Sequence, residues 1–196
     1  MNLYKLNTYP IILIFLNIIF HFVPFERKSL APDDYSLLTY NRNSENYFLD
    51  FFERPIQLYY FDLQYWLIGD SAFFGFLILI LTSSILIVTV YYLFLLLINE
   101  NKLSFVFSIF YLVFYSKLAI YNNLINAHII LVSSFYIMSL IFFIKYSDDK
   151  KVFLLLISLF LYFISIFFYE IGIFLPLILT FFYKKVPLKT LSIYFI

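Results

Sequence analysis

Long apolar runs separated by polar stretches divide this chain of 196 residues. The runs cover residues 8–25, 72–98, 103–116 and 124–144, and another fills most of 150–185. An α-helix rises about 1.5 Å per residue, so the longer runs can cross a hydrocarbon core of ~30 Å. The pattern predicts an all-α fold, a polytopic bundle of transmembrane helices.

The composition supports the same class of protein. Hydrophobic residues make up 64% of the chain and charged residues 13%, against roughly 25% charged residues in soluble proteins. We therefore expect an integral membrane protein in contact with the lipid bilayer and without a nucleic-acid partner. The chain has no cysteine, which excludes disulfides, thiolate metal sites and thiol nucleophiles.

The polar stretch at 26–70 holds eight of the twelve acidic residues. Within it, the aromatic residues of 46–54 fall on one face of a predicted helix, which Pro55 is expected to end. Residues 56–68 are rich in tyrosine and carry Trp66, side chains that suit the headgroup zone of a membrane. Both segments are predicted to be amphipathic helices that lie flat on the membrane surface.

The run at 150–185 is too long for one crossing, because a single helix of its inner residues would measure about 51 Å. A hairpin that turns near Glu170 places both of its lysine pairs on the same side, whereas a single tilted span separates them. Residues 188–196 begin another span that stops before it could cross, so we expect the front part of a longer protein. The predicted organisation is a first span at 1–25, an exoplasmic loop at 26–70, a bundle of about five spans at 71–185 and the start of a further span at 186–196.

Lysines and arginines set the orientation. With a cytoplasmic N-terminus, eight lysines lie inside and five basic residues outside, as the positive-inside rule favours. The loop at 26–70 then faces the periplasm or another exoplasmic space, and we expect a bacterial inner membrane. A cleaved signal peptide is the alternative for the first run, but this run exceeds the usual ~7–15 apolar residues and Pro32 would follow the cut.

Polar side chains that could carry chemistry gather on the outer side. They are Asp33 and Asp34 in the loop and, near the predicted outer ends of the spans, His21, Lys117, Asn126, His128 and Glu170. Ionisable groups at membrane depth are costly and usually line a cavity, so we expect a site between the loop and these helix ends. Each residue also fits a structural role: the aspartates as caps of a loop helix, the histidines as hydrogen-bonded interfacial side chains, and Glu170 as a turn residue in water.

Three short motifs follow one another in a recognisable order. Asp33-Asp34-Tyr35 stands soon after the first span, Arg54-Pro55 separates the two amphipathic helices, and Phe-Tyr-Glu-Ile-Gly at 168–172 marks the predicted hairpin turn. This order resembles the N-terminal half of the GT-C superfamily of membrane glycosyltransferases, which includes protein O-mannosyltransferases and the bacterial aminoarabinose lipid A transferase. The resemblance implies transfer of a sugar from a polyprenyl-phosphate carrier to a lipid, glycan or protein acceptor at the outer face of the cell envelope.

The resemblance also implies roles for these residues. The acceptor hydroxyl must lose a proton, and the departing phosphate must meet positive charge. Asp33 or Asp34 is the candidate general base. The candidate substrate- and phosphate-binding residues are Arg54, Arg42, Arg27, His128 and Glu170, with the arginines offering a planar fork of donors. A divalent cation, Mg²⁺ or Mn²⁺, is compatible with the reaction but not required by the sequence, and Asp33 or Asp34 would hold it.

Three other functions fit the apolar pattern. A lipid-sugar flippase or another transporter should carry polar residues across mid-membrane depth and broken helices. An O-antigen-type polymerase should carry its important loop later in the chain, and a non-catalytic assembly subunit would suit the short chain. The ionisable residues here gather at one face, which favours the transferase, but the sequence leaves open whether this chain alone is an enzyme.

Overall fold

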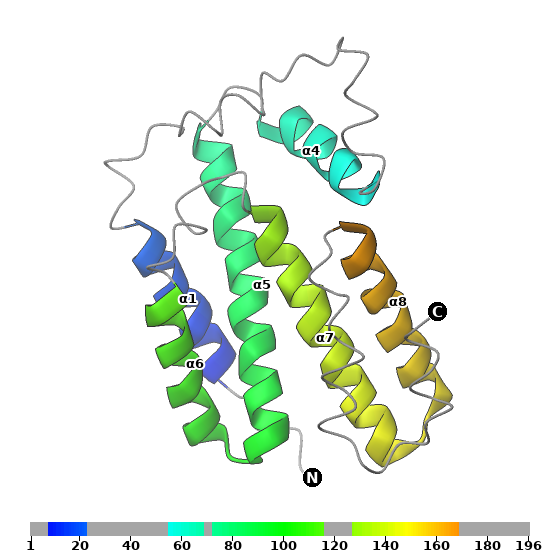
Figure 1. Ribbon diagram of the computed structural model, residues 1–196. Helices are drawn as coiled ribbons and strands as arrows, with labels where there is room; N and C mark the ends of the chain where they lie inside the picture. Colours follow the sequence, from blue (N-terminus) through cyan, green and yellow to red (C-terminus); the bar gives the residue numbers. More distant parts are fainter. Residues whose placement is uncertain (1–7, 23–54, 69–71, 116–126, 169–196) are drawn as a thin grey trace. The chain divides into compact units, whose positions relative to one another are not determined.

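The computed structural model describes residues 8–22, 55–68, 72–115 and 127–168. The six helices in this part of the chain are α1 (Tyr9–Phe22), α4 (Pro55–Ile68), α5 (Ala72–Ile98), α6 (Asn101–Tyr115), α7 (Ala127–Asp149) and α8 (Val152–Phe168) (Figure 1). The predicted all-α class is therefore confirmed for the described residues.

The helix bounds agree closely with the apolar runs. Helix α5 covers the predicted 72–98, and α4 starts one residue before the predicted 56–68. The first residue of α4 is Pro55. The fixed φ of proline suits a helix, and proline lacks only an N–H that would have no acceptor at this position. Helix α7 runs on to Asp149 instead of ending near 144, because its last turn adds Tyr146, which packs against the core between α7 and α8.

Two helices end at residues in the left-handed region. Asn99 follows α5 with a φ of 57°, and Lys150 follows α7 with a φ of 56°. The Asn99 N–H donates to the Leu95 carbonyl at 2.9 Å, and the Lys150 N–H donates to the Tyr146 carbonyl at 2.8 Å. Each residue thus satisfies a carbonyl that the helix end would leave open. One further residue precedes the next helix in each case, so α5–α6 and α7–α8 are tight helical hairpins.

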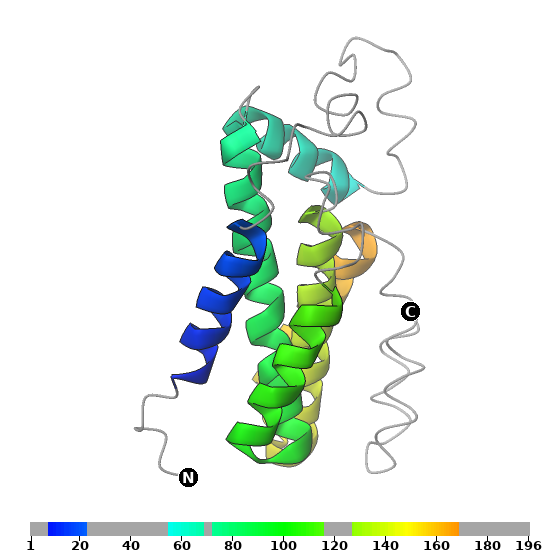
Figure 2. The same ribbon diagram turned by 90° about the vertical axis from the view of Figure 1, so that its left-hand side faces the viewer.

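The helices fall into two compact units, and the first contains α1, α5 and α6. Both α1 and α6 pack along α5, as Figure 1 shows, and Figure 2 shows α1 beside α5 from the side. The buried core of this unit consists of Leu13, Ile87, Tyr91 and Leu112. The Tyr9 ring adds a contact between the start of α1 and α6, with its centroid 4.7 Å from that of Phe105.

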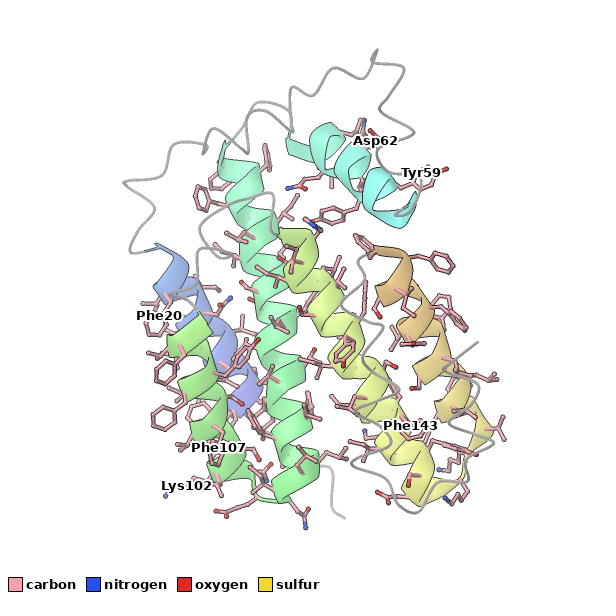
Figure 3. The ribbon with its side chains drawn as sticks, in the orientation of Figure 1. Phe20, Tyr59, Asp62, Lys102, Phe107 and Phe143 are labelled. Carbon is pink, nitrogen blue, oxygen red and sulfur yellow. The ribbon has the colours of Figure 1, made fainter. Side chains whose placement is uncertain are left out.

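The second unit contains α8, most of α7 and the first part of α4. Phe143 of α7, labelled in Figure 3, packs with Leu155 and Tyr162 of α8 to form its buried core. The Tyr60 ring of α4 meets the edge of the Phe168 ring, with 5.5 Å between the centroids. This contact joins α4 to the C-terminal end of α8.

The described helices bury polar side chains and expose apolar ones. On α6, Ser104 and Ser108 are fully buried, whereas Phe107 is 43% and Phe114 71% exposed. Phe20 of α1 is also exposed, and Figure 3 labels it together with Phe107. Helix α8 repeats the arrangement, with buried serines at 158 and 165 and exposed phenylalanines at 153, 160, 163 and 167. A helix of a water-soluble bundle shows the reverse polarity.

Two of the described helices, α5 and α7, are long and apolar enough to cross a membrane. At about 1.5 Å per residue they measure about 40 Å and 35 Å. Helices α1, α6 and α8 are apolar but shorter. These lengths support the predicted membrane location in its general form, while the number of spans and their orientation stay predictions.

Candidate functional site

Most of the site predicted from the sequence lies outside the described residues. This applies to Asp33, Asp34, Arg27, Arg42, Arg54, Lys117, Asn126 and Glu170. Their roles as base, phosphate ligands or loop residues therefore stay predictions. Within the described ranges, no group of three or more histidine, aspartate or glutamate side chains is placed to hold a metal ion, and the predicted cation ligands are not among those residues.

Two predicted site residues lie in described helices. His21 is in the last turn of α1, and His128 is the second residue of α7. The His128 side chain is only 3% exposed, and it does not lack an interaction partner. A buried imidazole of this kind is compatible both with the wall of a site and with a structural role.

Four groups of the first unit form a polar cluster, which we call the Asn17 cluster: the side chains of Asn17, Ser83 and Ser84 and the carbonyl of Ile80. Asn17 of α1 is fully buried, and its Nδ2 donates to Ser83 Oγ at 2.8 Å and to Ser84 Oγ at 3.1 Å. The same nitrogen lies 3.4 Å from the Ile80 carbonyl oxygen, which also accepts a hydrogen bond from Ser83 Oγ at 3.1 Å. The cluster thus joins α1 to α5 through hydrogen bonds between neutral groups.

The other end of the Asn17 amide is unsatisfied. Its Oδ1 is buried and accepts no hydrogen bond, although a buried amide oxygen normally has a donor. Reversing the amide would let Oδ1 accept from both serine hydroxyls, but it would leave the Nδ2 hydrogens bare instead. In either orientation, the end of the amide that points away from the serines has unused hydrogen-bonding capacity.

No family model, curated protein or solved structure matches this chain. The likeness to GT-C glycosyltransferases therefore rests on the short motifs quoted above.

A hydrogen bond between α5 and α6 has a structural role. The Tyr91 hydroxyl donates to Asn101 Oδ1 at 3.0 Å, and the ring is fully buried beside Tyr9, with 6.4 Å between the centroids. The hydrogen bond spans the turn of the α5–α6 hairpin. It therefore satisfies a buried phenol and fixes the start of α6 against α5.

The reasoning from sequence missed the Asn17 cluster. The available signal was the interruption of the apolar run at 8–25 by Asn17 and of the run at 72–98 by Thr82-Ser83-Ser84. Polar side chains within a span face the protein interior because lipid cannot satisfy them. The prediction concentrated on ionisable residues, whereas this cluster is built from neutral ones.

Proposed function

We propose that this chain is an integral membrane glycosyltransferase that moves a sugar from a polyprenyl-phosphate carrier to an acceptor on the outer face of the membrane. The observation that carries the proposal is the sequence Asp33-Asp34-Tyr35 in an acidic stretch between apolar helices. The outward-facing phenylalanines of α6 and α8 support the membrane setting, because acyl chains would cover them. The lengths of α5 and α7 support it as well.

In this proposal Asp33 or Asp34 takes the proton from the acceptor hydroxyl. Arg54 binds the phosphate of the carrier, with Arg27 and Arg42 as further candidates. The start of α4 at Pro55 supports a role for Arg54, since Arg54 directly precedes it in the sequence and a helix N-terminus attracts anions. The phosphate would then leave towards a region of positive charge, which lowers the cost of breaking its bond to the sugar.

The test is sugar transfer by the purified chain in lipid, using lipid-linked sugars extracted from its own membranes. Removing a general base typically lowers a rate by about 10²–10⁴, so the double variant Asp33→Asn with Asp34→Asn should lose transfer by that factor. Asp148→Asn, at an exposed position near the end of α7, is the matched control and should keep full activity. Full transfer by the double variant would rule out the assignment of the base.

The orientation has its own test, because a chain without cysteine accepts single labelling sites. On intact cells, a membrane-impermeant maleimide should label Asn41→Cys in the proposed exoplasmic loop. It should label Asp148→Cys only after the membrane is permeabilised. The opposite pattern would place the Asp33-Asp34 loop in the cytoplasm and remove the proposed access to an external acceptor.

One observation favours a transporter as the second candidate. The Asn17 cluster puts neutral polar groups beside the middle of α5, a depth at which transporters bind their substrates. In sealed proteoliposomes without an acceptor, a transporter would move lipid-linked sugar to the opposite leaflet, and Asn17→Leu would slow that movement. If the chain is a transferase, neither the wild-type chain nor Asn17→Leu would change the distribution of lipid-linked sugar between the two leaflets.

A further inference from the structure

Three exposed lysines gather at the turn between α7 and α8: Lys145, Lys150 and Lys151. The exposed aspartates Asp148 and Asp149 stand among them, so the turn has one net positive charge. Asp149 Oδ2 lies 3.9 Å from Lys151 Nζ, and the two side chains are 55% and 73% exposed. An ion pair this long and this exposed is weak, so Lys151 remains available to a stronger anionic partner.

The geometry of the turn does not require lysine. The α5–α6 turn has the same form, with one left-handed residue and one further residue between the helices, but its left-handed residue is Asn99. Glycine and asparagine suit this conformation better than lysine does. The charge of Lys150 suits the C-terminal end of α7, whereas Lys151 directly precedes the N-terminal end of α8, which disfavours a cation. Helix stability therefore explains Lys150 in part and does not explain Lys151.

The residues that follow the lysines place this turn at the edge of a bilayer. Val152 and Phe153 of α8 are 63% and 69% exposed, and exposed phenylalanines continue along the helix to Phe167. Acyl chains would cover these side chains, so the hydrocarbon core begins within the first turn of α8. Lysine side chains at such a boundary extend their ammonium groups to the level of the lipid phosphates.

We propose that the α7–α8 turn binds the headgroup of an anionic phospholipid through Lys150 and Lys151, with Lys145 adding to the positive charge. The Tyr146 ring supports Lys150, whose Nζ lies 5.9 Å from the ring centroid. The phosphodiester accepts hydrogen bonds from both ammonium groups, and its negative charge balances the net charge of the turn. A zwitterionic headgroup binds less strongly, because it brings a cation of its own to the same place.

The test uses the full chain in phosphatidylcholine vesicles that contain an equal small fraction of either brominated phosphatidylglycerol or brominated phosphatidylcholine. Trp66→Phe removes the only tryptophan, and Phe153→Trp places an indole beside the turn. Bromine quenches this indole when the lipid is bound next to it, so the two degrees of quenching give the preference for the anionic headgroup. We expect a preference of about fivefold at low salt for one net charge, and its loss at high salt.

Single substitutions change the charge of the turn one step at a time. Lys150→Gln and Lys151→Gln each leave the turn neutral, and each should lower the preference about fivefold, to nearly none. Asp149→Asn adds one net positive charge and releases Lys151, so it should raise the preference about fivefold. The matched control is Lys102→Gln, which removes an exposed lysine near the start of α6 (Figure 3) and should leave the preference unchanged.

Equal quenching by the two brominated lipids in the chain with both lysines would overturn the proposal. An unchanged preference in Lys150→Gln and Lys151→Gln, or its loss in Lys102→Gln, would also overturn it, since either result separates lipid selection from this turn. The folding of each variant is checked by circular dichroism. Asp149→Asn keeps the test decisive if a lysine variant unfolds, because misfolding does not raise the preference, and a preference that fails to rise contradicts the proposal. Sugar transfer plays no part in these measurements, so this proposal and the proposed function can fail independently.

Discussion

Two reciprocal hydrogen bonds close the α7–α8 hairpin, and they allow a quantitative test of how these helices associate. Ser139 Oγ donates to the Ser158 carbonyl at 2.8 Å, and Ser158 Oγ donates to the Ser139 carbonyl at 2.7 Å. Both serines are fully buried. Each hydroxyl has a single hydrogen and donates it to the carbonyl of the facing serine. The two Oγ atoms are only 3.1 Å apart, but no hydrogen is left for a bond between them.

The expected cost of losing these bonds is modest. Interhelical hydrogen bonds in membranes contribute on average about 0.6 kcal/mol and at most about 1.7 kcal/mol. Alanine leaves no bare polar group behind, because each serine carbonyl can still accept its own intrahelical bond. Loss of the interhelical bond in Ser139→Ala or in Ser158→Ala should therefore contribute about 0.5–1 kcal/mol of destabilisation, before any gain in helix propensity. The double variant should cost less than the sum, because loss of one bond loosens the geometry of the other.

The assay is unfolding by added SDS in mixed micelles, followed by circular dichroism. Ser165→Ala is the matched control, since Ser165 is equally buried on α8 but donates within its own helix, to the Tyr162 carbonyl at 2.7 Å. All three variants gain the same helix propensity from alanine, about 0.5 kcal/mol. The difference from Ser165→Ala thus isolates the interhelical bond.

Equal free energies of unfolding for Ser139→Ala and Ser165→Ala would refute this reasoning, because the bond between the helices would then contribute nothing. A double variant that costs clearly more than the sum of the two single variants would contradict the proposed coupling. The first result would indicate that apolar packing around Phe143 holds the hairpin together.

Three further predictions concern other parts of the described chain. Lys150→Val should destabilise the protein by about 1–2 kcal/mol in the same assay, because a β-branched residue resists a φ of 56°, whereas Lys150→Gly should not. Tyr91→Phe should cost about 0.5–1 kcal/mol through the lost bond to Asn101, and Tyr92→Phe, at an exposed position, should cost nothing measurable. Trp66, the only tryptophan and 77% exposed, should have its fluorescence quenched by brominated lipids in reconstituted bilayers, and quenching by aqueous iodide alone would contradict an interfacial α4.

The helix bounds could be predicted where polar residues interrupt an apolar run sharply. Helix α5 is the clearest case, because Gly69-Asp70-Ser71 precedes it and Asn99 follows it. The end of α7 could not be predicted in this way. Its charged last turn looks like a loop in a hydropathy pattern, but Tyr146 packs against the core and the Lys150 N–H closes the helix. Tertiary packing decided that boundary.

The sequence could predict some parts of the candidate site but not others. The acidic loop and its Asp33-Asp34 pair could be recognised from sequence because charges are rare elsewhere in the chain. The partnership of Asn17 with Ser83 could not, because the two residues are 66 positions apart. Local periodicity shows which face of a helix is polar, but it does not show the register between two helices.

The exposed phenylalanines of α6 and α8 have a thermodynamic consequence. Water-soluble proteins have strongly curved stability profiles because unfolding exposes apolar surface to water and raises the heat capacity. Here most phenylalanine rings of α6 and α8 already face outward, and a bilayer would surround them whether the helices are packed or separated. Separation of the helices within the membrane should then change the heat capacity little. Stability should fall almost linearly on heating, with no loss of structure in the cold.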